Sequence, residues 1–280
     1  MGLCQGKKMY KVDKIVVKDN KSSENLCVLN ENIVTQNENG KSQLLIQQMK
    51  SQIASCINYS QIESEINLPI GEGYLEWTYQ DGSRYEGFWK KMAPNGQGKL
   101  WMANGDIFEG QFVNGLLVQG SHISVNGNTY NGEFVDGLYH GYGQIIEFLG
   151  DTYSGQFVKG MKQGKGIMKK SDGTMYDGEW NQNIQRGFGL CVWKDDSRYE
   201  GQWEENLMHG QGTYYWKGRK YEGQYYYGQK HGKGKYYWNS NTYYDGEWSN
   251  GVQNGEGILV INQQVVQSGI WKAGVFQQKK

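Results

Sequence analysis

The sequence predicts an all-β fold: an elongated, single-layer antiparallel sheet built from tandem β-hairpin repeats. Glycine fills 41 of the 280 positions and proline only 2, while the chain carries 10 tryptophans and 21 tyrosines. Aromatic residues favour strands and glycine favours turns. A third observation, a glycine flanked by aromatic residues at near-constant spacing, indicates that the strands belong to a repeat.

The repeat consists of an aromatic residue, any residue, glycine, any residue and a second aromatic residue, as in Tyr85-Glu86-Gly87-Phe88-Trp89. Its glycine recurs every 22 or 23 residues, at Gly87, Gly110, Gly132, Gly155, Gly178, Gly201, Gly223, Gly246 and Gly269. A fixed period of this length is the signature of a repeat architecture.

A second signature, a Gly-x-Gly pair such as Gly210 and Gly212, runs in phase with the first. Dipeptides such as Asp81-Gly82 and Asn114-Gly115 lie between the two signatures, and Asn-Gly or Asp-Gly between short strands predicts a type I′ hairpin turn. Each repeat is therefore expected to form two short strands, about 18 in all.

Alternation along a strand places Tyr199, Gly201 and Trp203 on one face, and Glu200 and Gln202 on the other. One face of the sheet is thus aromatic with glycine gaps, and the other is polar. A missing Cβ leaves room for a ring from a neighbouring strand, so we expect a twisted trough with an aromatic groove on its concave side.

The composition changes near residue 70. Residues 1–70 hold only 3 of the 41 glycines, 2 of the 21 tyrosines and no tryptophan. We predict a flexible tail over 1–40, a short amphipathic helix and linker over 41–70, and the repeat array over 71–280. The helix is indicated by Leu45, Met49, Ile53 and Ile57 at four-residue spacing, and we expect it to dock in the chain's own groove.

The repeat resembles the MORN (membrane occupation and recognition nexus) family. The fullest copies are Tyr199-Glu200-Gly201-Gln202-Trp203 with His209-Gly210-Gln211-Gly212, and Tyr221-Glu222-Gly223-Gln224-Tyr225 with His231-Gly232-Lys233-Gly234. The resemblance implies a binding or scaffolding array, in some members linked to phospholipids. The copies at 108–129 and 244–276 depart from the pattern, and we interpret them as a kink and a terminal cap.

Several function classes are disfavoured. The chain carries 29 basic and 29 acidic side chains, which argues against nucleic-acid binding. The Gly-x-Gly pairs lack the remaining residues of a phosphate-binding loop. Equivalent histidines of adjacent repeats, such as His209 and His231, would lie roughly 9–10 Å apart, too far to share a metal ion. We expect no metal, no cofactor and no enzymatic activity.

The N-terminus carries a candidate acylation signal. Gly2 follows the initiator methionine as N-myristoylation requires, and Cys4 beside it is a candidate for palmitoylation. Basic residues that would lie near the membrane follow at Lys7, Lys8, Lys11 and Lys14. Two acyl chains together with a basic stretch would give stable attachment, so we expect a cytoplasmic, membrane-associated protein.

The leading functional hypothesis is a scaffold that binds a helical or extended segment of a protein partner in the aromatic groove. The candidate groove residues form the densest aromatic row in the chain: Tyr199, Trp203, Tyr214, Trp216, Tyr221, Tyr225, Tyr236 and Trp238. The alternatives are a structural component of a ciliary or cytoskeletal assembly and an accessory subunit of a phospholipid kinase. An anionic phospholipid ligand and a homodimer also remain open.

Overall fold

The computed structural model describes residues 72–277, all strands and turns, and confirms the all-β prediction. These residues belong to one of the two units of the chain, Ile57–Lys280. The strands are β1 (Gly73–Thr78), β2 (Arg84–Lys90), β3 (Ala93–Trp101), β4 (Ile107–Val113), β5 (Leu116–Ile123), β6 (Thr129–Val135), β7 (Leu138–Ile146), β8 (Thr152–Val158), β9 (Met161–Lys169), β10 (Met175–Asn181), β11 (Ile184–Val192), β12 (Arg198–Glu204), β13 (Leu207–Trp216), β14 (Arg219–Tyr226), β15 (Gln229–Asn239), β16 (Thr242–Ser249), β17 (Val252–Ile261), β18 (Gln264–Lys272) and β19 (Val275–Gln277).

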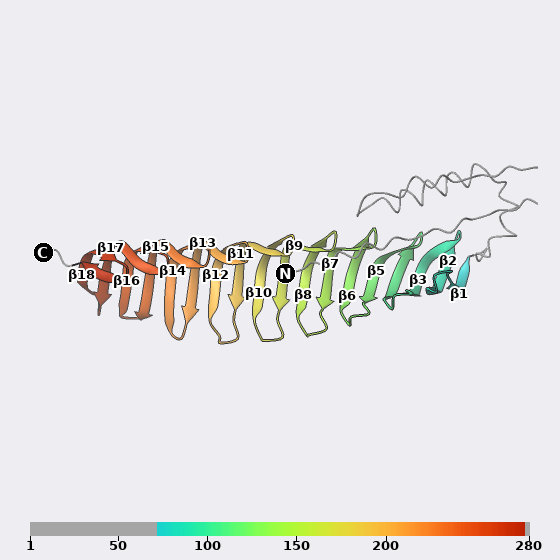
Figure 1. Ribbon diagram of the computed structural model, residues 1–280, viewed down its shortest axis with the longest axis horizontal. Helices are drawn as coiled ribbons and strands as arrows, with labels where there is room; N and C mark the ends of the chain where they lie inside the picture. The colour runs from blue at the N-terminus through green and yellow to red at the C-terminus, as the bar shows by residue number, and fades with distance from the viewer. Residues whose placement is uncertain (1–71, 278–280) are drawn as a thin grey trace, which may run out of the picture. The chain divides into compact units, whose positions relative to one another are not determined.

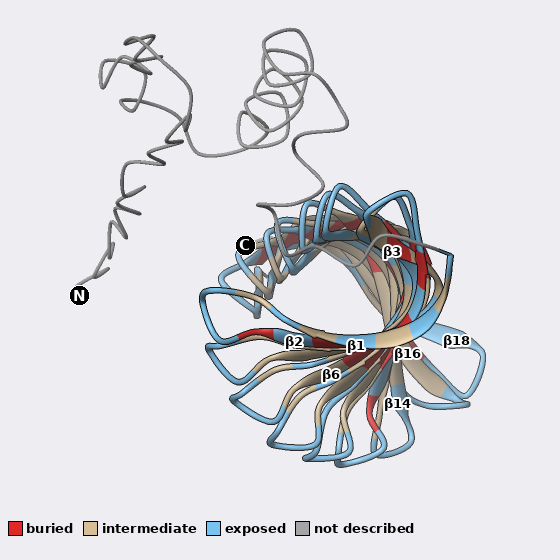
Figure 2. Cartoon of the chain, turned by 90° about the vertical axis from the view of Figure 1, so that its right-hand side faces the viewer, coloured by how far each residue is buried: buried red, intermediate tan, exposed pale blue. Residues whose placement is uncertain are grey.

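Each strand pairs antiparallel with the next one in the sequence, so the array is a meander from β1 to β19 (Figure 1). The 19 strands slightly exceed the expected 18, and the last of them, β19, has three residues. Viewed along the array, the sheet is curled, with exposed turns at its periphery and buried residues within the strands (Figure 2).

One row of the sheet consists of glycine alone across 17 neighbouring strands. In consecutive strands Gly87 pairs with Gly98, Gly98 with Gly110, and so on to Gly257 with Gly269. The two sequence signatures therefore meet in a single line, which we call the glycine row: Gly87, Gly98, Gly110, Gly120, Gly132, Gly143, Gly155, Gly166, Gly178, Gly189, Gly201, Gly212, Gly223, Gly234, Gly246, Gly257 and Gly269.

The glycine row is covered by tyrosine rings. Tyr176, for example, lies so close over the row that a Cβ at Gly189 would stand 2.6 Å from its hydroxyl oxygen. That hydroxyl donates a hydrogen bond to the carbonyl of Glu179, three residues further along the same strand, at 3.1 Å. The same bond recurs for Tyr85, Tyr130, Tyr153, Tyr199, Tyr221 and Tyr244.

The tyrosines also join neighbouring repeats. Tyr176 packs edge-to-face on Trp180 of its own repeat and on Trp203 of the next, with ring centroids 5.2 Å apart in both pairs. Edge-to-face pairs stabilise by roughly 0.5–1.5 kcal/mol beyond the area they bury. From Tyr130 to Trp271 these contacts form an unbroken ladder, which is the core of the array.

The first glycine of each Gly-x-Gly pair has a different role. Gly210 takes φ +57, a left-handed conformation that favours glycine, next to a shift of register between β12 and β13. The Gln202 side chain fills the space that a Cβ at Gly210 would need, and its Oε1 accepts a hydrogen bond from the Gln211 amide at 2.7 Å. The residue after the repeat glycine thus secures this bulge.

The first atypical copy keeps its place in the sheet. Val118 replaces the left-handed glycine there, and the register shift moves to Gln111 and Phe112. Pairing continues on both sides of β5. At the C-terminal end, Phe276 of β19 packs on the buried Trp271 with centroids 4.7 Å apart.

We predict that Gly189→Ala lowers the free energy of unfolding by about 1–3 kcal/mol, because overpacking displaces the Tyr176 ring. Gly189 is not in a left-handed conformation, so the effect would report the ring contact alone. Chemical denaturation measures it. Glu200→Ala, on the exposed opposite face, is the control and should change stability by less than about 0.5 kcal/mol; equal effects of the two would contradict the role of the glycine row.

Candidate functional site

The aromatic face carries two kinds of side chain in the row next to the glycines. Even-numbered strands contribute the tyrosines of the ladder, which are at most 2% exposed. Odd-numbered strands contribute partly buried side chains that pack against the ladder, among them Leu100, Ile145, Met168, Tyr214, Tyr236 and Leu259. The odd-numbered strands therefore supply the part of this face that another molecule can touch.

The structure divides the eight predicted groove residues into two sets. Tyr199, Trp203, Tyr221 and Tyr225 are buried, with exposed fractions of 0–5%. Their rings belong to the core ladder, because each is covered by a ring of an adjacent repeat. Burial here is set by the curl of the sheet, which alternation along a strand does not reveal.

The other four predicted residues, Tyr214, Trp216, Tyr236 and Trp238, keep part of their surface open. Trp238 is 36% exposed, and its ring packs on Tyr236 at 5.0 Å. We call these four the aromatic platform. They come from the neighbouring odd-numbered strands β13 and β15, so they offer an open apolar surface in the C-terminal half of the array.

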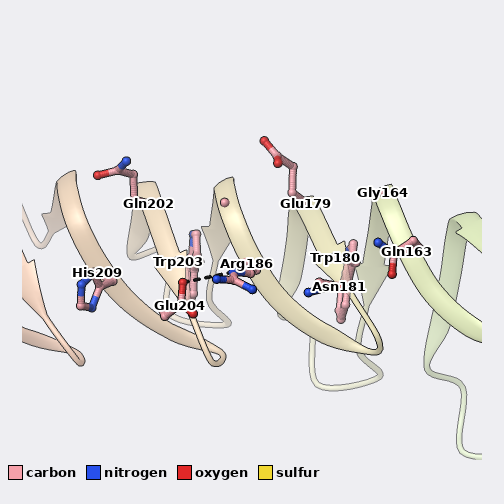
Figure 3. A pocket seen from close by; sticks show the side chains of 11 residues that line it. Gln163, Gly164, Glu179, Trp180, Asn181, Arg186, Gln202, Trp203, Glu204 and His209 are labelled. Atoms are coloured by element: carbon pink, nitrogen blue, oxygen red, sulfur yellow. Dashed lines mark ion pairs between the residues drawn. The ribbon is translucent and has the colours of Figure 1, made fainter.

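Two hollows among residues 72–277 are lined partly by aromatic side chains. A hollow of about 650 Å³ lies beside Trp238, Leu259 and Trp271 at the C-terminal end. A second, of about 470 Å³, lies between Trp180 and Trp203. Figure 3 shows these two indoles in equivalent positions of adjacent repeats, with the Arg186–Glu204 ion pair of 3.3 Å beside them.

Lys230 lies on the aromatic face and is the main feature that the sequence analysis missed. It pairs with Tyr225 in the hairpin of β14 and β15. Its Nζ stands over the rings of Tyr236, Trp248 and Tyr221, at 4.3, 4.9 and 5.3 Å from their centroids. Burial among these rings lowers the pKa of Lys230 to about 8. The sequence could have revealed this lysine, because the equivalent position in the preceding repeat holds an apolar residue, Met208.

Burial shifts the pKa of three other sheltered groups in the direction that favours their neutral forms. Burial raises the pKa of the Cys191 thiol to about 11 and that of the Tyr153 hydroxyl to about 12. His122 is stacked on Phe108, its Nδ1 forms a hydrogen bond with the Tyr139 hydroxyl at 2.7 Å, and burial lowers its pKa.

The remaining histidines lie near hairpin turns. His209 packs against Tyr226 and Tyr227, His231 packs against Tyr226, and His140 is half-buried. Within residues 72–277 no three His, Cys, Asp or Glu side chains come together in a way that could hold a metal ion.

The predicted lipidation residues Gly2 and Cys4, the basic residues Lys7, Lys8, Lys11 and Lys14, and the predicted helix over 41–57 lie outside the described residues. Among residues 72–277, no helix has the length and apolar character needed to cross a bilayer.

Comparison with known proteins gives one clear result. The family model of the MORN repeat matches at residues 85–107, 108–129, 130–146, 153–175, 176–198, 199–218, 221–243 and 244–262. Together these matches cover more than half of the chain. No curated protein matches the sequence.

Solved structures give only distant similarity. The G-box domain of the microcephaly protein CPAP is 10% identical, with 70% of this chain and 100% of that chain covered and a TM-score of 0.36. The TCP10 domain of Danio rerio CPAP is 12% identical, with coverage of 70% and 100% and a TM-score of 0.31. The same domain in complex with a peptide of Danio rerio STIL is 11% identical, with coverage of 71% and 100% and a TM-score of 0.30. TM-scores this low carry no argument about function.

We predict that Lys230→Met stabilises the array at pH 7 by on the order of 1–3 kcal/mol. Each unit of pKa shift is worth about 1.4 kcal/mol, and cation–π attraction offsets part of the burial cost. Because the folded-state pKa is lowered, wild-type stability should rise from pH 8 to about 10.4, the unfolded value. The gain from the substitution should therefore shrink over that window in melting experiments; a gain that does not vary with pH would contradict the assignment.

Proposed function

The chain belongs to the MORN repeat family, and from this premise we propose that it is a non-catalytic scaffold that binds a helical or extended segment of a protein partner along its aromatic face. The observation that carries the proposal is the aromatic platform, four large rings that two strands, β13 and β15, leave partly open on the same face. Tryptophan and tyrosine are the residues most enriched at binding hot spots.

The arrangement of the strands supports a linear partner. Equivalent positions of successive repeats follow one another along the array (Figure 1), roughly 9–10 Å apart for two strand spacings. A helix or an extended segment lying along the array would meet the same kind of half-buried side chain at regular intervals. MORN repeats are generally binding modules, which supports the non-catalytic part of the proposal.

We further propose that the N-terminus attaches this scaffold to the cytoplasmic face of a membrane through acylation at Gly2 and Cys4. Support comes from the sequence alone: the two candidate sites are followed by Lys7, Lys8, Lys11 and Lys14. A single myristoyl chain binds a membrane only marginally, and the second chain and the basic residues would supply the rest.

The binding proposal is tested by comparing the two sets of aromatic residues. Trp216→Ala and Trp238→Ala should leave the melting temperature nearly unchanged and weaken partner recovery, with a loss of about 2 kcal/mol or more at a hot spot. Trp203→Ala, in the core, should lower the free energy of unfolding by about 3–5 kcal/mol. If Trp216→Ala and Trp238→Ala leave the recovery of co-purifying proteins unchanged, the platform is not the binding surface.

The membrane proposal has a separate test. Gly2→Ala should move the protein from the membrane fraction to the soluble fraction, and Cys4→Ser should do so more weakly, since it leaves one acyl chain. Fractionation of cells that express each variant measures the distribution, with Ser22→Ala as the control in the same tail. Equal partitioning of wild type and Gly2→Ala would remove acylation from the proposed function.

A further inference from the structure

We propose that Lys230 is the recognition point for a carboxylate of the bound segment, an aspartate or glutamate flanked by apolar residues that lie on the aromatic platform. The inference rests on the proposed function, because it names the chemistry of the partner that this face would accept.

Lys230 lacks the counter-charge that three other sheltered lysines have. Among residues 72–277, the partly buried lysines Lys99, Lys220 and Lys235 each form an ion pair of 2.6–3.0 Å with Glu109, Glu222 and Asp245. The lysines and arginines of this region without such a pair are exposed to water, with two exceptions, Lys162 and Lys230.

Lys162 occupies the equivalent position three repeats earlier, and its Nζ lies over the equivalent rings of Tyr153 and Trp180, at 5.1 and 5.3 Å from their centroids. Its Nζ donates to the Met168 sulfur at 3.6 Å, and Glu147 and Asp151 are close enough to raise its pKa against the effect of burial. For Lys230, burial lowers the pKa, and no carboxylate of the described residues lies within ion-pair distance of its Nζ. Among residues 72–277, Lys230 is therefore a sheltered cation without an ion pair, and unlike Lys162 it also lies against a ring of the aromatic platform, Tyr236.

Three aromatic rings surround the ammonium group of Lys230. The rings of Tyr236, Trp248 and Tyr221 hold the ammonium group at 4.3–5.3 Å from their centroids. These rings attract a cation but accept no strong hydrogen bond, so the N–H donors of Lys230 remain available. With a pKa of about 8 the group is charged at neutral pH, and an added carboxylate would supply both charge and acceptors.

An apolar surface that a partner could contact lies beside the ammonium group of Lys230. Tyr236, the nearest of the three rings, packs on the partly exposed Trp238. Two more cations, Lys217 and Arg219, lie near the exposed side of Trp216 at 5.3 and 5.5 Å. An acidic segment with apolar neighbours would thus find complementary charge and rings over β13–β15.

The chain itself offers a matched control. Met208 occupies the position equivalent to Lys230 one repeat earlier and packs against the core. Methionine thus fits this site in the array, and Lys230→Met removes the charge with little change in packing. Lys162→Met serves as a second control, because it removes a sheltered lysine that already has carboxylates nearby.

The test uses the full chain and two synthetic amphipathic helical peptides of alanine, leucine and glutamate, about 20 residues long to span roughly 30 Å, one with every glutamate replaced by glutamine. We expect the glutamate peptide to bind wild type at least tenfold more tightly in calorimetry. Lys230→Met should remove this preference and leave the affinity for the glutamine peptide unchanged, while Lys162→Met should retain the preference. Binding should also raise the pKa of Lys230, measured by NMR on labelled lysine side chains.

The outcomes separate this inference from the proposed function. If both peptides bind wild type equally, or the preference survives in Lys230→Met, the role of Lys230 is overturned while binding on the aromatic face stands. If neither peptide binds, both are overturned. A glutamate preference that disappears with Lys162→Met and Lys230→Met alike would show a general charge effect and would also overturn the assignment.

Discussion

The contact between tyrosine rings and bare backbone along the glycine row is the constraint on which the rest of this structure depends. Each glycine weakens its strand by roughly 0.5–1 kcal/mol relative to alanine, yet any Cβ in the row would collide with a ring or with the neighbouring strand. What the backbone loses in stability is offset by burial of a whole tyrosine ring and by its hydroxyl bond to the same strand. The rings can cover the sheet only because the glycine row carries no side chains.

This constraint gives the array its one-dimensional character. A tyrosine such as Tyr176 contacts a ring of its own repeat and a ring of the next, so the core is a chain of neighbour contacts rather than a central cluster. The tyrosines of the even-numbered strands are therefore buried in the core and leave no surface for binding. The side chains that differ between repeats and can contact a partner lie on the odd-numbered strands, where the corresponding positions hold Leu100, Met168 and Tyr214.

The sequence predicted the family, the hairpins and the aromatic face because those features repeat every 22 or 23 residues. It could not separate Tyr199 from Tyr214, since both lie on the same face and burial depends on the curl of the sheet. It also treated Gln202 as part of a polar outer row, whereas its side chain secures the bulge at Gly210. This contact recurs nine residues apart in successive repeats, but alternation along a strand does not predict it, because it crosses a change of register.

Lys230 extends this reasoning to function. Each position of the repeat recurs in every copy. Met208, at the position equivalent to Lys230, shows that an uncharged side chain fits this site. A lysine there exchanges favourable apolar packing for a cation whose charge is disfavoured by burial. Local violations of the rules that stabilise a fold concentrate at functional sites. Two repeats of this array accept such a cost, at Lys162 and Lys230. Of the two, Lys230 lies against Tyr236 of the aromatic platform, so a binding function is most to be sought there.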